Sequence, residues 1–311
     1  MPEPEPTPGA LALAFEVEGR QITGLDWGGD GPDVLLLHPN GFCAGIFDPV
    51  VAHLTGRFRC FGLDLCGHGG SDGPADLDDF TMEGIAADVA AILDRRPGSS
   101  LRVVGHSLGG VVATLLAAIR PQRVTQLVLL EPVIIPPPPL SDRTAGPSPM
   151  SEAARRRRRV WASRDEMRER FRTVAPLSGF DPAALEAYLR HGVRDRPDGQ
   201  VELACDPAME AAVFACTPGP RGGWPAWEHL PRLTVPLTIV SGRDTNLPDG
   251  LFEQQAHHAA CDHLRADGGH LFPQERPAAT AALLASLLGG WGLRAAREGP
   301  RSGSAAPGGD G

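Results

Sequence analysis

Residues 105–109 read Gly-His-Ser-Leu-Gly, a spacing in which the central serine can act as a nucleophile. The β-rich run LRVV leads into this pattern and the apolar run VVATLLAAIR follows it. We therefore expect a sharp turn between a strand and a helix, a nucleophile elbow with Ser107 at its tip. Gly105 and Gly109 would let the helix and the strand approach where a Cβ atom would collide. The first N–H groups of the helix would point at the site beside Ser107.

A serine hydroxyl is a poor nucleophile and needs a base. Of the ten histidines, His270 is the candidate, because it lies in the glycine-flanked loop GGHLFPQERP near the end of the α/β pattern. A loop at a strand end can bring its side chain to a serine on another strand. His106 adjoins Ser107 but is expected to point elsewhere, and His38 and His68 are expected to hold turns together.

The base in turn needs a carboxylate on its other ring nitrogen. Asp244 is the favoured candidate, because it follows the run LTIVSG and precedes His270, which gives the order serine, acid, histidine. Glu131 is the alternative acid. It ends the earlier run LVLLE, and a carboxylate there could reach the same imidazole.

Two N–H donors are needed to stabilise the oxyanion formed when a serine attacks a carbonyl. One is expected from Leu108, the residue after the nucleophile. The other is expected from the loop at residues 38–42, His-Pro-Asn-Gly-Phe, in which Pro39 has no N–H. Asn40 is the first candidate for this oxyanion hole and Phe42 the alternative.

Short apolar runs alternate with helical patterns along the chain. The helix candidates are Met82–Leu93 and Val111–Arg120, and the runs have the length of buried strands. The runs are VLLLH (34–38), FRCFGLDL (58–65), LRVVG (101–105), LVLLE (127–131) and LTIVSG (237–242). This alternation predicts an α/β fold of three layers with a mostly parallel sheet.

The alternation stops at residue 132 and resumes near 232. We expect a single α/β domain over residues 11–293, with its core in 11–131 and 232–293 and a helical cap inserted at 132–231 over the ligand-binding edge of the sheet. The tails at 1–10 and 294–311 are rich in Pro, Gly and Ser and are predicted to be disordered.

The cap contains five successive arginines, Arg155 to Arg159, within a charged pattern read as one helix. A helix turns by 100° per residue, so these side chains would surround it rather than form one basic stripe. We expect a solvated helix paired with nearby acidic residues such as Glu152 and Glu166. Binding of an anionic substrate group is the alternative.

Composition excludes several kinds of chemistry. All 29 basic residues are Arg, and without Lys there can be no Schiff base, pyridoxal anchor or phosphate-loop lysine. The net charge of −9 argues against nucleic acid as a partner. No apolar run is long enough for an integral membrane protein, and no secretory signal is visible. The six cysteines form no CxxC pairs, which favours reduced thiols and a cytoplasmic protein.

The histidines and the cysteine near residue 260 do not have the spacing of metal ligands, so we expect neither a metal nor a cofactor. The residues concerned are His257, His258, Cys261 and His263.

Five ordered motifs together resemble the α/β-hydrolase superfamily: LLLHPNGF, DLCGHGGSD (64–72), GHSLGG, SGRDTNLP and GGHLFPQERP. The HPNGF loop and the cap resemble a subgroup of bacterial hydrolases related to fungal peroxisomal lipase-like and toxin-biosynthesis hydrolases. The resemblance places Asn40 where the family has an oxyanion donor. Three departures stand out: Cys66 where the family usually has Arg, Pro39 in place of a loop glycine, and a loop after Gly242 that is one residue short around the acid.

The resemblance and the motifs imply a serine hydrolase that cleaves a small or lipid-like carboxylic ester or lactone through an acyl-enzyme. Its partner would be a small molecule with a carbonyl group. Two other reactions use the same residues: hydrolysis of a carbon–carbon bond, and a cofactor-free perhydrolase or haloperoxidase reaction. A receptor of another class, which binds a small ligand on this fold without turnover, is a further alternative.

Overall fold

A computed structural model describes residues 9–96, 98, 100–138 and 148–291. The predicted tail at 294–311 and the first eight residues of the predicted tail at 1–10 lie outside the described residues. Over the ranges that are described, no helix is both long and apolar enough to cross a membrane.

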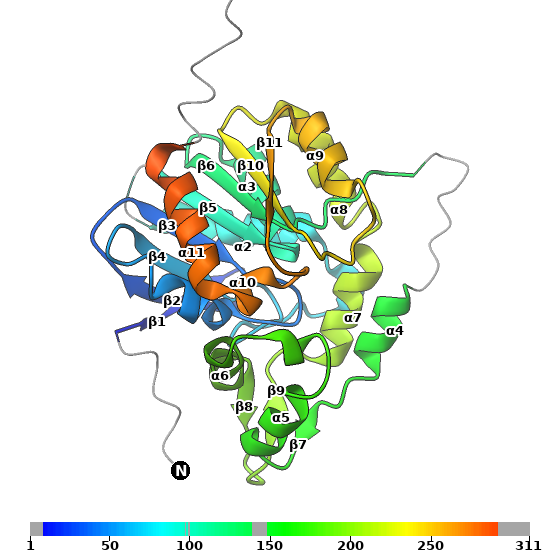
Figure 1. The fold of residues 1–311 in the computed structure, drawn as a ribbon. Helices are drawn as coiled ribbons and strands as arrows, with labels where there is room; N and C mark the ends of the chain where they lie inside the picture. The colour runs from blue at the N-terminus through cyan, green and yellow to red at the C-terminus, as the bar shows by residue number, and fades with distance from the viewer. Residues whose placement is uncertain (1–8, 97, 99, 139–147, 292–311) are drawn as a thin grey trace, which may run out of the picture.

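The core of the chain is an eight-stranded sheet in the order β1-β2-β4-β3-β5-β6-β10-β11 (Figure 1). The pairs β1–β2 and β2–β4 are antiparallel, and from β4 to β11 all neighbours are parallel. The strands are β1 (Leu11–Val17), β2 (Arg20–Gly28), β3 (Asp33–Leu37), β4 (Arg59–Leu63), β5 (Leu101–His106), β6 (Val124–Leu130), β10 (Leu237–Gly242) and β11 (Asp262–Ala266).

Helices cover both faces of this sheet, and each face has its own apolar cluster. Along β3, Leu35 and Leu37 belong to one cluster, and Val34 and Leu36 to the other. Such a strand is apolar throughout because successive side chains enter opposite layers. The helices of the first layer are α2 (Met82–Arg95), α3 (Leu108–Ile119), α8 (Gly223–His229) and α9 (Leu251–Ala259). Those of the second are α1 (Asp48–Val51), α10 (Phe272–Glu275) and α11 (Pro277–Ser286).

This arrangement confirms the predicted three-layer α/β fold. The five apolar runs are β3, β4, β5, β6 and β10, and the two predicted helices are α2 and α3. Three strands of this eight-stranded sheet were not predicted. One face is exposed in β1 and largely half-buried in β2, and β11 is an edge strand with only half-buried or exposed side chains, so none of them is a continuous apolar run.

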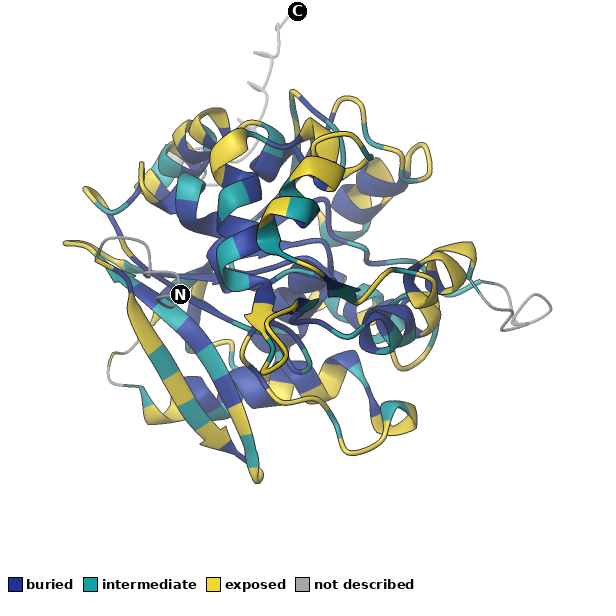
Figure 2. Cartoon of the chain, turned by 90° about the horizontal axis from the view of Figure 1, so that it is seen from below, coloured by how far each residue is buried: buried dark blue, intermediate teal, exposed yellow. Residues whose placement is uncertain are grey.

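Residues 148–232 build a second group of elements, of which helix α8 also belongs to the first layer on the sheet. The helices are α4 (Pro149–Arg155), α5 (Arg164–Phe171), α6 (Pro182–His191), α7 (Pro207–Cys216) and α8, and a small antiparallel sheet joins β7 (Val160–Trp161), β9 (Val201–Leu203) and β8 (Val193–Asp195). Short helical turns occur at η1 (Ala44–Phe47), η2 (Leu77–Asp79), η4 (Leu177–Gly179), η5 (Leu230–Arg232) and η6 (Leu287–Trp291). Figure 2 shows that buried residues fill the centre of the molecule, while exposed ones lie on outer helix faces and loops.

The prediction of one long charged helix through the arginine run is wrong. Helix α4 ends at Arg155, and residues 156–163 pass through β7 before α5 begins. The interruption fits the sequence Val160-Trp161, because a β-branched and an aromatic residue favour a strand. Ser163 then caps α5 by accepting a hydrogen bond from the Glu166 N–H at 3.1 Å.

Cys66, which departs from the family motif, has an arginine beside it that comes from another strand. Arg20 of β2 donates from Nη1 to the Cys66 sulfur at 3.0 Å and from Nη2 to Asp88 of α2 at 2.7 Å. Burial raises the pKa of the Cys66 thiol to about 11. The thiol is therefore protonated at neutral pH and serves as a packing and hydrogen-bonding group.

Candidate active site

Ser107 lies on the turn between β5 and α3 in a strained backbone conformation, with φ 55° and ψ −111°. A serine with positive φ costs about 1–3 kcal/mol, so the surrounding structure must hold it. The Ser107 N–H donates to the Leu130 carbonyl at 2.9 Å, and the Ser107 carbonyl accepts from Gly110 at 3.0 Å. These bonds to β6 and to the first turn of α3 fix the hydroxyl at the carboxyl edge of the sheet.

The two glycines of the turn have the steric role expected of them. A Cβ at Gly105 would lie 2.3 Å from the Gly109 carbonyl oxygen, and a Cβ at Gly109 would lie 2.1 Å from the carbonyl oxygen of Leu37. Both distances are far below contact, and both obstacles are backbone atoms. The N-terminus of α3 can therefore reach β3 and β5 only without these side chains.

His270 brings the serine and a carboxylate into one chain of hydrogen bonds. Its Nε2 is 3.0 Å from the Ser107 Oγ, and its Nδ1 is 2.9 Å from the Glu131 Oε2. A carboxylate can only accept here, so Nδ1 carries the proton and Nε2 is left to accept the serine proton. Of the two acids considered, the structure pairs His270 with Glu131 and not with Asp244.

The Glu131 carboxylate is fully buried at the end of β6 and is surrounded by donors. Its Oε1 accepts the Gly242 N–H, and its Oε2 accepts the Thr245 hydroxyl at 2.7 Å as well as the His270 imidazole. A buried carboxylate is stable only when such bonds replace its hydration. Three elements therefore converge on this one side chain.

Asp244 does not reach the site, which corrects the favoured assignment. It is exposed, and its backbone N–H donates to the Gly268 carbonyl at 3.0 Å. The next residue, Thr245, is the one that turns toward Glu131. The side chain of this loop that contacts Glu131 is therefore the Thr245 hydroxyl.

His106 contributes a contact that the sequence did not reveal. Its Nε2 is 2.9 Å from the main-chain carbonyl oxygen of His270, and the side chain is fully buried. Burial, with smaller effects from neighbouring histidines, lowers the pKa of His106 to about 3. The ring is therefore neutral and donates from Nε2, which ties the His270 loop to the end of β5. The two residues are 164 positions apart in the sequence, so the contact exists only in the folded chain.

The loop after β3 forms a tight turn beside the serine. The Phe42 N–H donates to the Pro39 carbonyl at 3.3 Å, and Gly41 has φ 78°, as in a type II turn. Within the described parts of the chain, the backbone N–H groups of Asn40 and Leu108 donate to no protein acceptor. The Phe42 N–H is already used inside the turn, whereas those of Asn40 and Leu108 are free donors among the described residues, as is that of Gly41.

Two buried histidines hold this turn. His38 accepts the Leu65 N–H at Nε2, so its Nδ1 carries the proton and donates to the Pro39 carbonyl at 2.8 Å. The Nε2 of His68 is 3.1 Å from the Asn40 Oδ1. Burial lowers the pKa of His38 to about 4 and that of His68 to about 3, so both are neutral near pH 7.

Other titratable groups do not assemble into a second centre in the described residues. No group of three or more His, Cys, Asp or Glu side chains there could hold a metal ion. His263 near residue 260 instead pairs with Ser241, and His258 stacks on Trp227. All six cysteines are free.

Comparisons with known proteins agree with this architecture. A family model described as the alpha/beta hydrolase fold matches residues 32–172. Over this stretch, which is less than half of the chain, the sequence is similar to the α/β-hydrolase superfamily. The strand order and the serine turn after β5 are the features that define this class here.

Several relatives carry names that describe an activity. Esterase Rv0045c from Mycobacterium tuberculosis is 26% identical over 287 residues, which is 90% of each chain. A pimeloyl-[acyl-carrier protein] methyl ester esterase from Nitrosomonas europaea is 42% identical over 102 residues, which is 33% of this chain and only 38% of that protein. The peroxisomal alpha-beta-hydrolase Lpx1 from Saccharomyces cerevisiae has a TM-score of 0.71 at 15% identity, covering 92% of this chain and 89% of Lpx1. At that identity the likeness is one of fold, and the predicted subgroup stays a prediction.

Proposed function

We propose that the protein is a serine hydrolase that cleaves carboxylic esters or lactones of small or lipid-like molecules. The observation that carries this proposal is the hydrogen-bonded chain of Ser107, His270 and Glu131 at a strained turn. The names of the relatives, esterase and methyl ester esterase, support an ester carbonyl as the group attacked.

In the first half of the reaction, His270 Nε2 takes the Ser107 proton as the Oγ attacks the substrate carbonyl. The negative oxygen of the tetrahedral intermediate accepts hydrogen bonds from the N–H groups of Leu108 and Asn40. Glu131 keeps the imidazole in the correct tautomer and stabilises its positive charge. The intermediate then expels the alcohol, which takes the proton from His270 and leaves the acyl group on Ser107.

In the second half, a water molecule gives a proton to His270 and attacks the acyl-enzyme. The same two N–H groups stabilise the second oxyanion. Collapse of that intermediate returns the proton to the Ser107 Oγ and releases the acid. No step needs a metal or a cofactor, and the six free, mostly buried thiols suit a reducing, cytoplasmic location.

We further propose that residues 132–231 act as the cap that encloses the substrate, with the core in residues 11–131 and 232–293. Aromatic side chains of this segment pack on Phe42, which follows the proposed oxyanion donor. The centroid of the Phe42 ring is 5.0 Å from that of Tyr188 and 5.9 Å from that of Phe180. The cap therefore contributes to the wall next to the reacting carbonyl.

A fluorophosphonate probe and a short p-nitrophenyl ester test this proposal. Wild-type protein should be labelled and should hydrolyse the ester, while Ser107→Ala should do neither. Ser241→Ala is the matched control, because Ser241 also pairs with a histidine, at 2.8 Å from His263 Nε2, but is buried within β10. Labelling of Ser107→Ala at the wild-type level, or no labelling of wild type, would contradict the proposal.

A further inference from the structure

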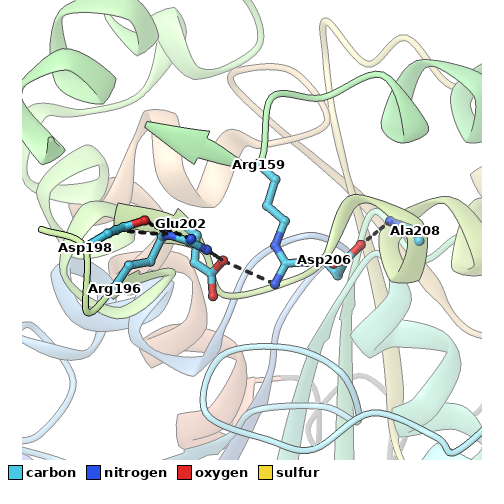
Figure 3. A network of polar contacts seen from close by, with 6 residues as sticks. All are labelled: Arg159, Arg196, Asp198, Glu202, Asp206 and Ala208. Carbon is cyan, nitrogen blue, oxygen red and sulfur yellow. Dashed lines mark hydrogen bonds and ion pairs between the residues drawn. The ribbon is translucent and has the colours of Figure 1, made fainter. Parts of the chain in front are cut away.

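The proposed function leaves the arginine run unexplained, and the structure divides this run. Three of the arginines face solvent and pair with acidic side chains of the same segment. These pairs are Arg156 with Glu152, Arg158 with Glu166, and Arg159 with Glu202 and Asp206. Figure 3 shows Arg159 between its two acids, beside the ion pairs of Arg196. Arg157 instead turns inward, toward the loop after β3.

Arg157 begins a relay of hydrogen bonds that ends on the proposed oxyanion loop. Its Nη1 pairs with the Glu210 Oε2, and its Nη2 donates to the Tyr188 hydroxyl oxygen at 3.2 Å. That hydroxyl donates in turn to the Gly41 carbonyl at 3.4 Å. Burial raises the pKa of the Tyr188 phenol, so the phenol keeps its proton at neutral pH and remains a donor.

Glu210 of α7 holds the same loop from a second direction. Its main-chain carbonyl accepts the Asn40 Nδ2 at 3.0 Å, and its carboxylate lies directly over Gly41. A Cβ at Gly41 would be 2.9 Å from the Glu210 Cδ and 3.3 Å from the Arg157 Nη1. On the opposite side, the Asn40 Oδ1 contacts His68 of the core. The turn is therefore held between the core and the cap.

We propose that Arg157, Tyr188 and Glu210 form a cap clamp, a set of positioning residues that orient the Asn40 N–H toward the oxyanion. The clamp rests on the proposed function, in which that N–H stabilises the intermediate. A two-residue turn with a positive-φ glycine can rotate its peptide planes readily, so external contacts must fix the direction of its N–H groups. The donor matters only if it points at the oxyanion, because misdirected donors lose most of their effect.

Tyr188→Phe is the primary test variant, since it removes only the hydroxyl and keeps the ring contacts with Phe42. Arg157→Met is the second, and it removes the start of the relay. Arg156→Met is the matched control, because Arg156 is the adjacent arginine but its side chain is 72% exposed and, among the described residues, pairs with Glu152 alone. All are made in the full chain and compared with wild type.

The measured quantities are kcat and KM for a p-nitrophenyl ester, their pH profile, and the inhibition constant of an alkyl trifluoromethyl ketone. The ketone forms a tetrahedral oxyanion on the serine, so its affinity reports the oxyanion donors. We expect Tyr188→Phe and Arg157→Met to lower kcat by about 10- to 100-fold and to weaken the ketone by a similar factor. The midpoint of the pH profile should not move, because His270 and Glu131 keep their contacts.

Two outcomes would overturn the clamp. The first is a wild-type kcat and ketone affinity in Tyr188→Phe, whatever happens to its melting temperature. The second is an equal loss in Arg156→Met, which would show a general effect of removing charge from the cap. If Arg157→Met does not fold, Tyr188→Phe carries the test alone. Failure of the proposed function is distinguishable, because wild-type protein would then show neither labelling nor ester turnover.

Discussion

At the scale of single residues, Glu131 combines full burial with an unusual backbone. It has φ 49°, a left-handed conformation that side chains other than Gly, Asn and Asp seldom adopt. The chain turns after β6, and the carboxylate lies at the edge of the His270 ring, 2.9 Å from its Nδ1. The strain and the buried charge are both compensated by the donors of Gly242, Thr245 and His270.

We expect Glu131→Gln to lower kcat for a p-nitrophenyl ester by about 10³- to 10⁴-fold, because an amide favours the wrong imidazole tautomer. Asp244→Asn, an equally conservative change in an exposed residue, should keep kcat within about twofold. Steady-state kinetics near pH 8 measure both. A large loss of kcat in Asp244→Asn together with an active Glu131→Gln would contradict this assignment and favour Asp244 as the acid.

The residue scale also shows what sequence could and could not predict. Ser107 and His270 were predicted because a nucleophile turn and a terminal histidine loop are local patterns. The choice between two acids depended on which strand end approaches one imidazole, and chain order favoured Asp244. His106 and the cap residues around Asn40 carry no local signal, since their partners lie more than 30 residues away in sequence.

At the scale of elements, the turn between β5 and α3 depends on the close approach of three backbones. The helix N-terminus touches both β3 and β5, and Gly109 donates to the His38 carbonyl at 3.2 Å. This bond joins the serine turn to the loop that carries Asn40. The two loops that supply the proposed oxyanion donors are therefore joined by a main-chain hydrogen bond.

We expect Gly109→Ala to lower the free energy of unfolding by about 3 kcal/mol or more, because its Cβ would overlap the Leu37 carbonyl. Gly56→Ala is the control, since nothing lies within 4 Å of a Cβ there. Urea denaturation of both variants measures the difference. Equal stability of the two would mean that β3 and α3 are not in close contact.

The helices and strands could be predicted where their own sequence shows a clear apolar pattern. Buried parallel strands are apolar throughout, so β3, β5, β6 and β10 were recognisable. β11 was not, because an edge strand with exposed Asp262 and Arg265 does not show such a run. The break between α4 and α5 was missed because the arginines on either side favour a helix, whereas pairing of β7 with β9 decides the conformation.

At the scale of the whole molecule, three buried histidines make folding depend on pH. Burial lowers the pKa of His38 to about 4, and those of His68 and His106 to about 3. In the unfolded chain these residues take up protons below about pH 6.5, while the folded chain does not. Their contribution to the free energy of unfolding is fully present above pH 6.5. It is lost as the pH falls toward the pKa values that these histidines have in the folded protein.

We therefore expect the free energy of unfolding to fall between pH 6.5 and pH 5, with each histidine adding up to about 1.4 kcal/mol per pH unit. His106→Gln should lower this slope by the part that His106 contributes, because one proton fewer is taken up on unfolding. Glutamine does not titrate but can still donate to the His270 carbonyl. Urea denaturation at four pH values measures the slope. A pH-independent stability, or an unchanged slope in His106→Gln, would contradict the assignment.

The position of Glu131 directly after β6 has an evolutionary consequence for the opposite side of the site. With Glu131 as the proposed acid, the contact that the loop after β10 supplies to it is the Thr245 hydroxyl. The residues beyond it, 246–250, are exposed or half-buried and border a groove that Ile135 and Pro136 line from the other side. Mutations, insertions and deletions can accumulate in this stretch without separating the acid from the base. The proposed reacting groups would therefore stay in place while this stretch changes.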